Sequence, residues 1–242
     1  PDMAETAVQI RGRGNTSWSG SYSSKNPYRL KFASKVKPFG MTKGKSWVLL
    51  SNKQTGSMTS NALAMKIADM VESRGCNHVI PVELYINGYY RGSYNFTENP
   101  GFSNNSIDLD DETNAVMLEL DSYYDEYKRF RDTSYNLPVN VKEPDFEDDI
   151  NAGLLTEGEV EERFSLIQQN FNTFTQDTKF GGTSHLDVDA FVRAMLVNDL
   201  VRNEEYKHPK SWKLYNPDIT NSDSLWTFGP VWDFDWSYGY DG

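Results

Sequence analysis

The chain has 242 residues, of which 38% are hydrophobic and 14% aromatic, and its formal net charge is −11. This length suits one large domain or two small lobes around a cleft, and no apolar run approaches the ~18 residues of a membrane span. The acidic net charge argues against nucleic acid and anionic lipid as partners. Cys76 is the one cysteine of the chain, so no internal disulfide can form.

Charge is distributed unevenly along the chain. Lys and Arg are dense from Arg11 to Lys53, a stretch without acidic residues, whereas Asp and Glu are concentrated from Asp108 to Glu162. The distribution indicates a basic first part that could bind an anion and an acidic second part that could bind a cation. Two solvated surfaces of opposite charge would explain the same pattern.

Alternation of apolar and polar residues predicts strands in the first part of the chain. Tyr28, Leu30 and Phe32 alternate with Arg29 and Lys31, which is typical of a half-buried strand with a basic face. Strands are predicted at residues 7–10, 27–32 and 47–50.

A helix and a hairpin are predicted next. The helix is expected from Thr59 to Val71, with Gly75 after its end. Its inward face is expected to carry Leu63, Ile67, Met70 and Val71. The pair Asn87-Gly88 between strands at 82–86 and 89–97 is typical of a type I′ turn.

The second half of the chain is predicted to be more helical. Thr156 and Glu159 form a capping box that begins a long amphipathic helix, and Asp187 is expected to cap another. The first helix should bury Val160, Phe164, Ile167, Phe171 and Phe174, and the second Phe191, Val192, Leu196, Leu200 and Val201. Further strands are expected at residues 117–120, 139–142, 212–215 and 226–228. The sequence thus predicts an α+β fold in which a small hairpin accompanies the helices of the second half.

Two aspartates near the end of the chain are candidate metal ligands. Asp233 and Asp235 alternate with Trp232, Phe234 and Trp236 after an apparent strand. Burial of two carboxylates side by side is expensive unless a cation lies between them, and oxygen ligands suit Mg²⁺ or Mn²⁺. The alternatives are that both side chains face solvent, pair with Lys or Arg, or cap a turn.

The loop at residues 11–18 is a candidate phosphate-binding loop. Gly12 and Gly14 allow close approach of the backbone to an anion, and the next strand carries Lys31. A glycine loop followed by a strand lysine is the order in which kinases cover and pair phosphates. An ordinary turn would explain the two glycines equally well.

The charged loop at residues 203–211 lies between a helix and a strand, where a phosphotransferase has its catalytic loop. Glu205 could accept the proton of a substrate hydroxyl, and His208 is a second candidate. An ordinary surface turn is the alternative.

Six sequence motifs, in this order, resemble the CotH family, which is named for a spore-coat protein kinase. They are RGRGNTSW at 11–18, NPYRLK at 26–31, WVLL at 47–50, YRGSY at 90–94 with TE at 97–98, LELD at 118–121, and GPVWDFD at 229–235. The matches span nearly the whole chain. These motifs resemble those of family members from Bacteroidetes and clostridia, in which the domain is part of larger exported proteins.

The resemblance implies a divergent bilobal protein-kinase-like fold, with a β-rich N-terminal lobe (about 1–100) and a more helical C-terminal lobe (101–242). It implies a single atypical secreted kinase domain that uses ATP and Mg²⁺ or Mn²⁺ to phosphorylate Ser or Thr of exported or cell-surface proteins. We expect a monomer located outside the cell. No signal peptide is visible, and we interpret the chain as trimmed before Pro1 and shortened at its C-terminal end.

The resemblance also implies roles for individual residues. Asp233 would be a metal ligand and catalytic residue, Asp235 a second metal ligand and Glu205 the catalytic base. The nucleotide would be bound by Arg11, Asn15, Lys31 and Arg29. Three glutamates are candidates for the partner of Lys31: Glu72, Glu98 and Glu119.

The sequence departs from the family pattern in the catalytic loop. Glu205 stands where the family has an aspartate, and Lys210 stands where an asparagine would bind a second metal ion. Two other functions therefore remain open. One is a weakly active or inactive cell-surface module that binds glycan or protein through aromatic residues. The other is a nucleotide-sugar transferase that uses Asp233 and Asp235 to bind a diphosphate through a metal ion.

Overall fold

The computed structural model describes residues 3–14, 16–18, 24–53 and 57–239. Its first half forms a five-stranded sheet in the order β1-β2-β3-β5-β4, in which every neighbouring pair is antiparallel. The strands are β1 (Val8–Gly12), β2 (Tyr28–Val36), β3 (Gly44–Leu50), β4 (Val79–Ile86) and β5 (Tyr89–Glu98). The predicted strands of this part are confirmed.

The two faces of the first sheet differ in chemistry, as the alternation in β2 predicts. Phe32 packs on one face in a small aromatic core with Trp47 and Phe96, whose rings are stacked with centroids 5.0 Å apart. The opposite face presents Arg29 and Lys31 to a cleft. This sheet therefore supplies a basic wall to the cleft while its other face holds an apolar core.

The β4–β5 hairpin has the predicted turn. Asn87 and Gly88 both have positive φ angles, of 53° and 78°. A type I′ turn requires positive φ at both central residues, which asparagine and glycine tolerate better than other residues.

The second half contains a larger sheet than the sequence predicts. Five antiparallel strands form it in the order β10-β9-β6-β8-β7. They are β6 (Val116–Leu120), β7 (Arg129–Arg131), β8 (Pro138–Glu143), β9 (Trp212–Asn216) and β10 (Thr227–Phe228). The expectation of a small hairpin beside the helices is wrong, because strands far apart in the sequence pair around the central strand β6.

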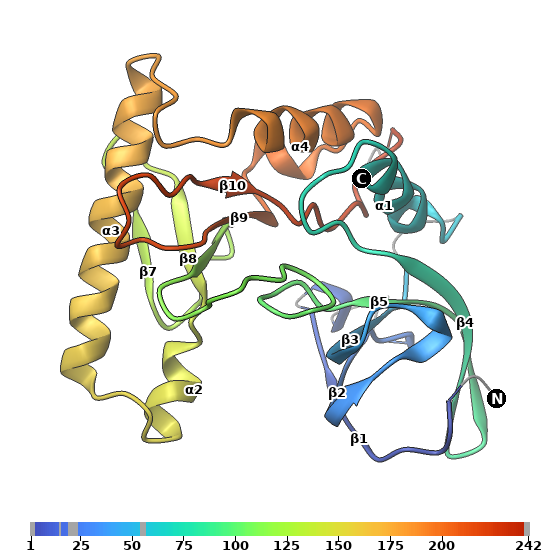
Figure 1. The fold of residues 1–242 in the computed structure, drawn as a ribbon. Helices are drawn as coiled ribbons and strands as arrows, with labels where there is room; N and C mark the ends of the chain where they lie inside the picture. The colour runs from blue at the N-terminus through green and yellow to red at the C-terminus, as the bar shows by residue number, and fades with distance from the viewer. Residues whose placement is uncertain (1–2, 15, 19–23, 54–56, 240–242) are drawn as a thin grey trace.

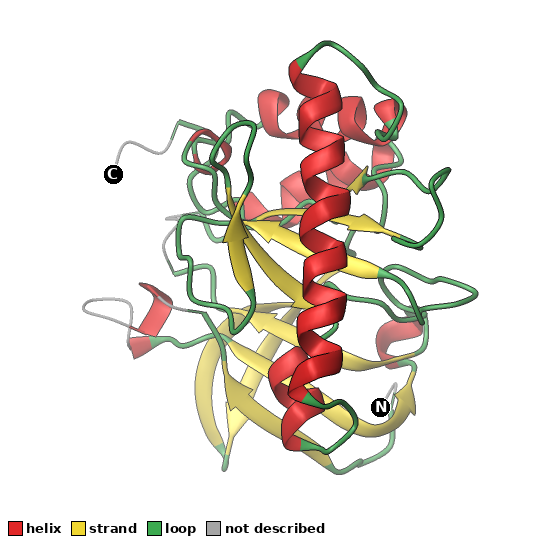
Figure 2. Cartoon of the chain, turned by 90° about the vertical axis from the view of Figure 1, so that its left-hand side faces the viewer, coloured by secondary structure: helices red, strands yellow, loops and turns green. Residues whose placement is uncertain are grey.

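Four α-helices accompany the sheets in the described part of the chain: α1 (Ser60–Met70), α2 (Phe146–Asn151), α3 (Glu157–Lys179) and α4 (Val188–Leu200). Three short 3-10 helices span Thr16–Trp18, Pro38–Gly40 and Glu205–Lys207. α3 runs along the second sheet (Figure 2), and its capping box at Thr156 and Glu159 is present. As predicted, Phe171 and Phe174 of α3 lie in the core. β7 and α2 have no counterpart among the predicted elements.

The predicted inward faces of α1 and α4 are confirmed only in part. Ile67, Val71, Phe191 and Val201 pack in the core as predicted, but other predicted residues do not. In α1 the side chains of Leu63 and Met70 are 50% and 72% exposed, and in α4 Leu200 is 59% exposed. The buried residues of both helices are mostly small, among them Ala64 and Ala68 of α1 and Ala190, Ala194 and Val197 of α4. Small residues let the helices approach their neighbours closely, so the larger aliphatic side chains lie outside.

One large core cluster joins the second sheet to the helices. It contains residues of α1, α3, α4 and β6, together with the C-terminal residues Val231, Trp232 and Phe234. The two sheets lie on opposite sides of the view in Figure 1, with α1 and α4 above them. This arrangement confirms the α+β class. Within the described residues, no helix has the length and apolar character needed to cross a bilayer.

Candidate active site

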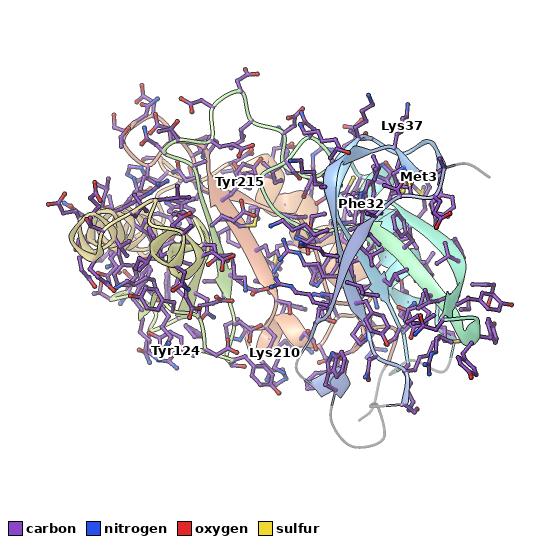
Figure 3. The ribbon with its side chains drawn as sticks, turned by 90° about the horizontal axis from the view of Figure 1, so that it is seen from below. Met3, Phe32, Lys37, Tyr124, Lys210 and Tyr215 are labelled. Atoms are coloured by element: carbon purple, nitrogen blue, oxygen red, sulfur yellow. The ribbon has the colours of Figure 1, made fainter. Side chains whose placement is uncertain are left out.

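A cleft of about 1110 Å³ lies between the two sheets and collects most of the predicted site residues. Its walls include β1, β2 and the end of β3 on one side, and β6, β8 and β9 on the other. In the view of Figure 3, Lys210 lies between the first sheet, which carries Phe32, and Tyr124 of the second half. Six predicted residues line the cleft: Arg11, Arg29, Lys31, Glu205, Asp233 and Asp235. Asn15 lies outside the described residues.

The Asp233–Asp235 segment is held by the side chain between the two carboxylates. Phe234 is fully buried in the large core cluster, and its backbone N–H donates to Asn61 Oδ1 over 2.9 Å. Both flanking aspartates line the cleft, and Asp233 has the left-handed φ of 63°. The aromatic residues that interrupt the acidic pair therefore anchor the segment, as its sequence suggests.

Both carboxylates are partly buried and hydrogen-bonded. Asp233 Oδ2 accepts from Ser211 Oγ over 3.2 Å, and Asp235 Oδ1 accepts from Asn61 Nδ2 over 2.6 Å. Burial raises the pKa of Asp233 above its ordinary range. Burial, followed by repulsion from Asp233, raises the pKa of Asp235 to about 7. The pair thus carries unfavourable negative charge that a bound cation would relieve.

Glu205 is a third carboxyl group of the cleft, and it is buried. Its side chain is 6% exposed, and Glu205 Oε2 has no hydrogen-bond partner among the described residues. Burial, followed by repulsion from Asp233, raises the pKa of Glu205 to about 9. A buried polar atom without a partner in a cleft is unusual in native proteins and points to a ligand or a catalytic role.

Asn203 connects the Glu205 loop to the Asp233 segment. Its Oδ1 accepts from the backbone N–H of Glu205 over 3.2 Å, and its Nδ2 donates to the backbone oxygen of Asp233 over 3.4 Å. The same Nδ2 donates to Asn198 Oδ1 in α4 over 2.9 Å. The catalytic-loop candidate and the metal-ligand candidate are therefore fixed to one helix.

Arg13 is a cation of the site that the sequence analysis did not select. Its guanidinium carbon lies 5.2 Å from the ring centroid of Trp232. Desolvation lowers the pKa of Arg13, whereas the charges of Asp233 and Glu119 raise it. The glycine loop places Arg13, because Trp18 packs where Gly12 would carry a Cβ and donates its Nε1–H to the Arg13 carbonyl over 2.6 Å.

Glu119 lies in an ion-pair network at the second sheet. Glu119 of β6 is directly opposite Lys213 of β9 and forms an ion pair with it. Lys142 Nζ of β8 lies 3.6 Å from the other Glu119 oxygen and also pairs with Glu126. Cross-strand pairing of this kind depends on the register, so the sequence alone gave no signal for Lys142 or Lys213.

The three glutamates considered as partners of Lys31 have other partners. Glu119 pairs with the two lysines described above. Glu98 Oε1 lies 2.9 Å from His78 Nδ1, and Glu72 Oε2 lies 3.3 Å from an Arg193 nitrogen. Lys31 itself is exposed on the cleft wall.

Lys210 lies at the cleft between two aromatic rings. Its Nζ is 4.7 Å from the ring centroid of Tyr123 and 5.0 Å from that of Trp236. Its charge lowers the pKa of Glu205 in opposition to burial. Lys210 therefore supplies a fixed positive charge close to the acidic group.

Arg29 of β2 also lines the cleft. Its Nε donates to Ser46 Oγ over 3.0 Å. Desolvation lowers its pKa, while the facing carboxylates of Glu143, Asp145 and Asp148 raise it. Burial raises the pKa of Glu143 to about 7. The cleft thus has an acidic region around Asp233 and a second region where Arg29 faces carboxylates.

The donors at Asp233 and Asp235 fit a magnesium or manganese ion. No group of three or more His, Cys, Asp or Glu side chains in the described ranges is arranged as a complete metal-binding set. Mg²⁺ in phosphotransferases is usually bound by one or two carboxylates, water and substrate phosphates. Asp233 and Asp235, two carboxylates of one cleft with raised pKa values, would supply the protein's part of such a set.

Comparisons with known proteins bear on the family of the chain. A search among curated proteins gave no match. A family model described as "CotH kinase protein" matches residues 8–242, which includes every residue of the cleft described above. The chain belongs to the CotH family.

Proposed function

We propose that this chain is an ATP-dependent protein kinase that phosphorylates Ser or Thr residues of exported or cell-surface proteins. The observation that carries the proposal is that Asp233, Asp235 and Glu205, three carboxyl groups with raised pKa values, line one large cleft. Phosphoryl transfer depends on positioning and on compensation of negative charge. A cleft with paired metal-ligand candidates and several fixed cations is suited to that task.

The residues of the cleft would have the following roles. Asp233 and Asp235 would bind Mg²⁺ or Mn²⁺, which neutralises charge on the ATP phosphates when it is bound. Arg13 is close enough to both carboxylates to influence them and would contact the phosphates beside the ion. Arg11, Arg29 and Lys31 on the cleft wall remain candidates for further contacts with the nucleotide.

Glu205 would act as the catalytic base. The acceptor hydroxyl oxygen would form a bond to the γ-phosphorus while the bond from that phosphorus to ADP breaks, and the hydroxyl proton would move to Glu205. With a pKa of about 9, Glu205 is protonated at neutral pH in the absence of ligands. Positive charge beside Asp233 and Asp235 would lower the pKa of Glu205 and make it competent as a base.

We further propose that residues 1–100 and 101–242 correspond to the two lobes of a kinase-like domain. Asn99 and Pro100, which follow β5, line the cleft together with Leu50 and Met117. This connection between the sheets offers apolar surface and backbone groups to a nucleotide base. We also propose that the chain acts as a monomer outside the cell. The family's link to spore coats supports the location.

Intact-mass spectrometry after incubation with ATP and Mn²⁺ or Mg²⁺ tests the proposal. The wild type should gain the mass of one or more phosphates, on itself or on an added acceptor protein, and Asp233→Asn should gain none. Addition of AMP instead of phosphate would show a different transfer reaction. No added mass, together with no ATP-dependent rise in Tm, would rule out the kinase function.

A surface binding module is the second candidate, and the β4–β5 hairpin favours it. Tyr85, Tyr89 and Tyr90 are 63%, 71% and 57% exposed at the end of this hairpin. Exposed aromatic clusters commonly mark binding surfaces. Under this function the chain would bind a glycan or protein through the tyrosines, and ATP would not stabilise it.

A further inference from the structure

The side-chain amide of Asn61 joins three segments of the chain: α1, the residues after β3, and the Asp233–Asp235 segment. It is 4% exposed near the start of α1. Its Nδ2 donates to Asp235 Oδ1 over 2.6 Å and to Asn52 Oδ1 over 3.2 Å. Its Oδ1 accepts the backbone N–H of Phe234 over 2.9 Å. An asparagine side chain has two N–H donors and one carbonyl acceptor, so each donor and the acceptor has a partner.

The helix fixes the position of this amide. Ala64, Met65 and Ala68 follow Asn61 on the inward side of α1 and are buried in the large core cluster. By contrast, the segment from Val231 to Phe234 belongs to no helix or strand. Asp235 is therefore oriented from outside its own segment, through the Asn61 amide and through burial of the adjacent Phe234.

Asn61 also connects the site to the first sheet. Asn52 lies just after β3 and has the left-handed φ of 50°, which asparagine tolerates. Because Asn61 bonds both to Asn52 and to Asp235, a shift of α1 relative to the first sheet would change the orientation of the Asp235 carboxylate.

We propose that Asn61 is the positioning residue of the metal site, which orients Asp235 for a divalent cation and makes cation binding depend on the position of α1. This inference rests on the proposed function in one respect, namely that Asp233 and Asp235 bind the ion. Hydrogen-bonding partners of metal ligands typically contribute about 10–100-fold to metal affinity. The same range is expected for Asn61.

Titration with Mn²⁺ alone, with free Mn²⁺ measured by electron paramagnetic resonance, tests this role. Asn61→Ala removes all three hydrogen bonds, and Asn61→Leu does so while keeping the branched shape of the side chain, so that no cavity is left. Both variants should bind Mn²⁺ about 10–100-fold more weakly than the wild type.

Asn77→Ala is the matched control. Asn77 is 2% exposed, its Nδ2 donates to Thr97 Oγ1 over 3.1 Å and to the Glu98 carbonyl over 2.7 Å, and it does not line the cleft. This variant should lose stability and keep the wild-type affinity for Mn²⁺. A comparable loss of affinity in Asn77→Ala would show that destabilisation alone explains the effect and would overturn the positioning role.

The two proposals fail in different ways. Wild-type affinity in folded Asn61→Leu would overturn the role of Asn61 and leave the kinase proposal intact. Failure of the wild type to bind Mn²⁺ both alone and in the presence of ATP would remove the metal site at Asp233 and Asp235, and with it both proposals.

Discussion

The guanidinium group of Arg13 lies over the ring of Trp232, with its central carbon 5.2 Å from the ring centroid. This contact joins the loop after β1 to the residue that directly precedes Asp233. Burial raises the pKa of Asp233 and of Asp235, and the positive charge of Arg13 opposes that rise. The glycine loop therefore contributes to the site through a cation held on an aromatic ring beside the acidic pair.

Arg13→Lys should weaken binding of Mn²⁺–ATP although it conserves the charge. Lysine lacks the planar fork that stacks on an indole and contacts two oxygens together. We expect a loss of about tenfold in affinity, equivalent to ~1.4 kcal/mol and within the range of a desolvated cation–π contact. Isothermal titration calorimetry would measure it.

Arg131→Lys provides a matched control for this prediction. The Arg131 guanidinium carbon also lies over an aromatic ring, 5.4 Å from the Tyr124 centroid, but Arg131 does not line the cleft. This variant should bind Mn²⁺–ATP as the wild type does. Equal affinities for all three proteins would show that Arg13 does not contact the nucleotide.

Gly12→Ala should disturb the loop that holds Arg13. A Cβ at Gly12 would overlap the Trp18 ring, whose Nε1–H holds the Arg13 carbonyl. The ring must move, so Arg13 loses its support and the ATP-dependent rise in Tm should shrink. Gly158→Ala, in the first turn of α3 with open space around the site of a Cβ, should instead raise stability by ~0.5–1 kcal/mol and preserve the ATP effect. An unchanged ATP effect in Gly12→Ala would contradict this role of the loop.

The sequence predicts the strands of this fold better than the packing of its helices. Strict alternation, as in Tyr28, Leu30 and Phe32, reports directly which face of β2 is buried. In α1 the prediction was only half right: Ile67 and Val71 pack against the core, but small Ala64 and Ala68 are buried there while Leu63 faces outward. Sequence pattern cannot decide between these faces when partner elements are unknown.

The candidate site could likewise be predicted only in part from the sequence. Asp233, Asp235 and Glu205 were selected from local motifs, and the structure brings them to one cleft. Asn61 and Lys213 were missed because their contacts depend on which distant segments meet. Arg13 could have been selected from the sequence, because it lies in the glycine loop. Its contact with Trp232, which only the structure shows, distinguishes it from Arg11.

Glu205→Gln should remove a pH dependence of stability along with the transfer activity. Glutamine resembles the protonated acid but accepts no proton. The pKa of Glu205 is about 9 in the folded chain and ordinarily near 4.5. The folded state therefore binds more protons, and its stability decreases as the pH rises from about 5 towards 9.

Thermal unfolding in the presence of a chelator would reveal this effect. The Tm of the wild type should fall relative to that of Glu205→Gln as the pH rises, with the smallest difference near pH 5. Parallel curves for the two proteins would mean that Glu205 is not protonated in the folded, metal-free chain.

Lys210→Met should change the pH dependence of phosphoryl transfer. Methionine can keep the packing between Tyr123 and Trp236 while the positive charge is lost. Because the charge of Lys210 lowers the pKa of Glu205, its removal should raise that pKa. The acidic limb of the pH–rate profile should shift to higher pH, with a several-fold lower rate near pH 7.

Lys207→Met separates this effect from a general loss of positive charge in the loop. Lys207 follows Glu205 by two residues, pairs with Glu204 and is largely exposed. Its substitution should leave the acidic limb of the profile unchanged, because exposed charges are screened by solvent. A shift of equal size in both variants would assign the effect to the charge of the whole loop, and no shift in Lys210→Met would exclude Lys210 as the cation that controls Glu205.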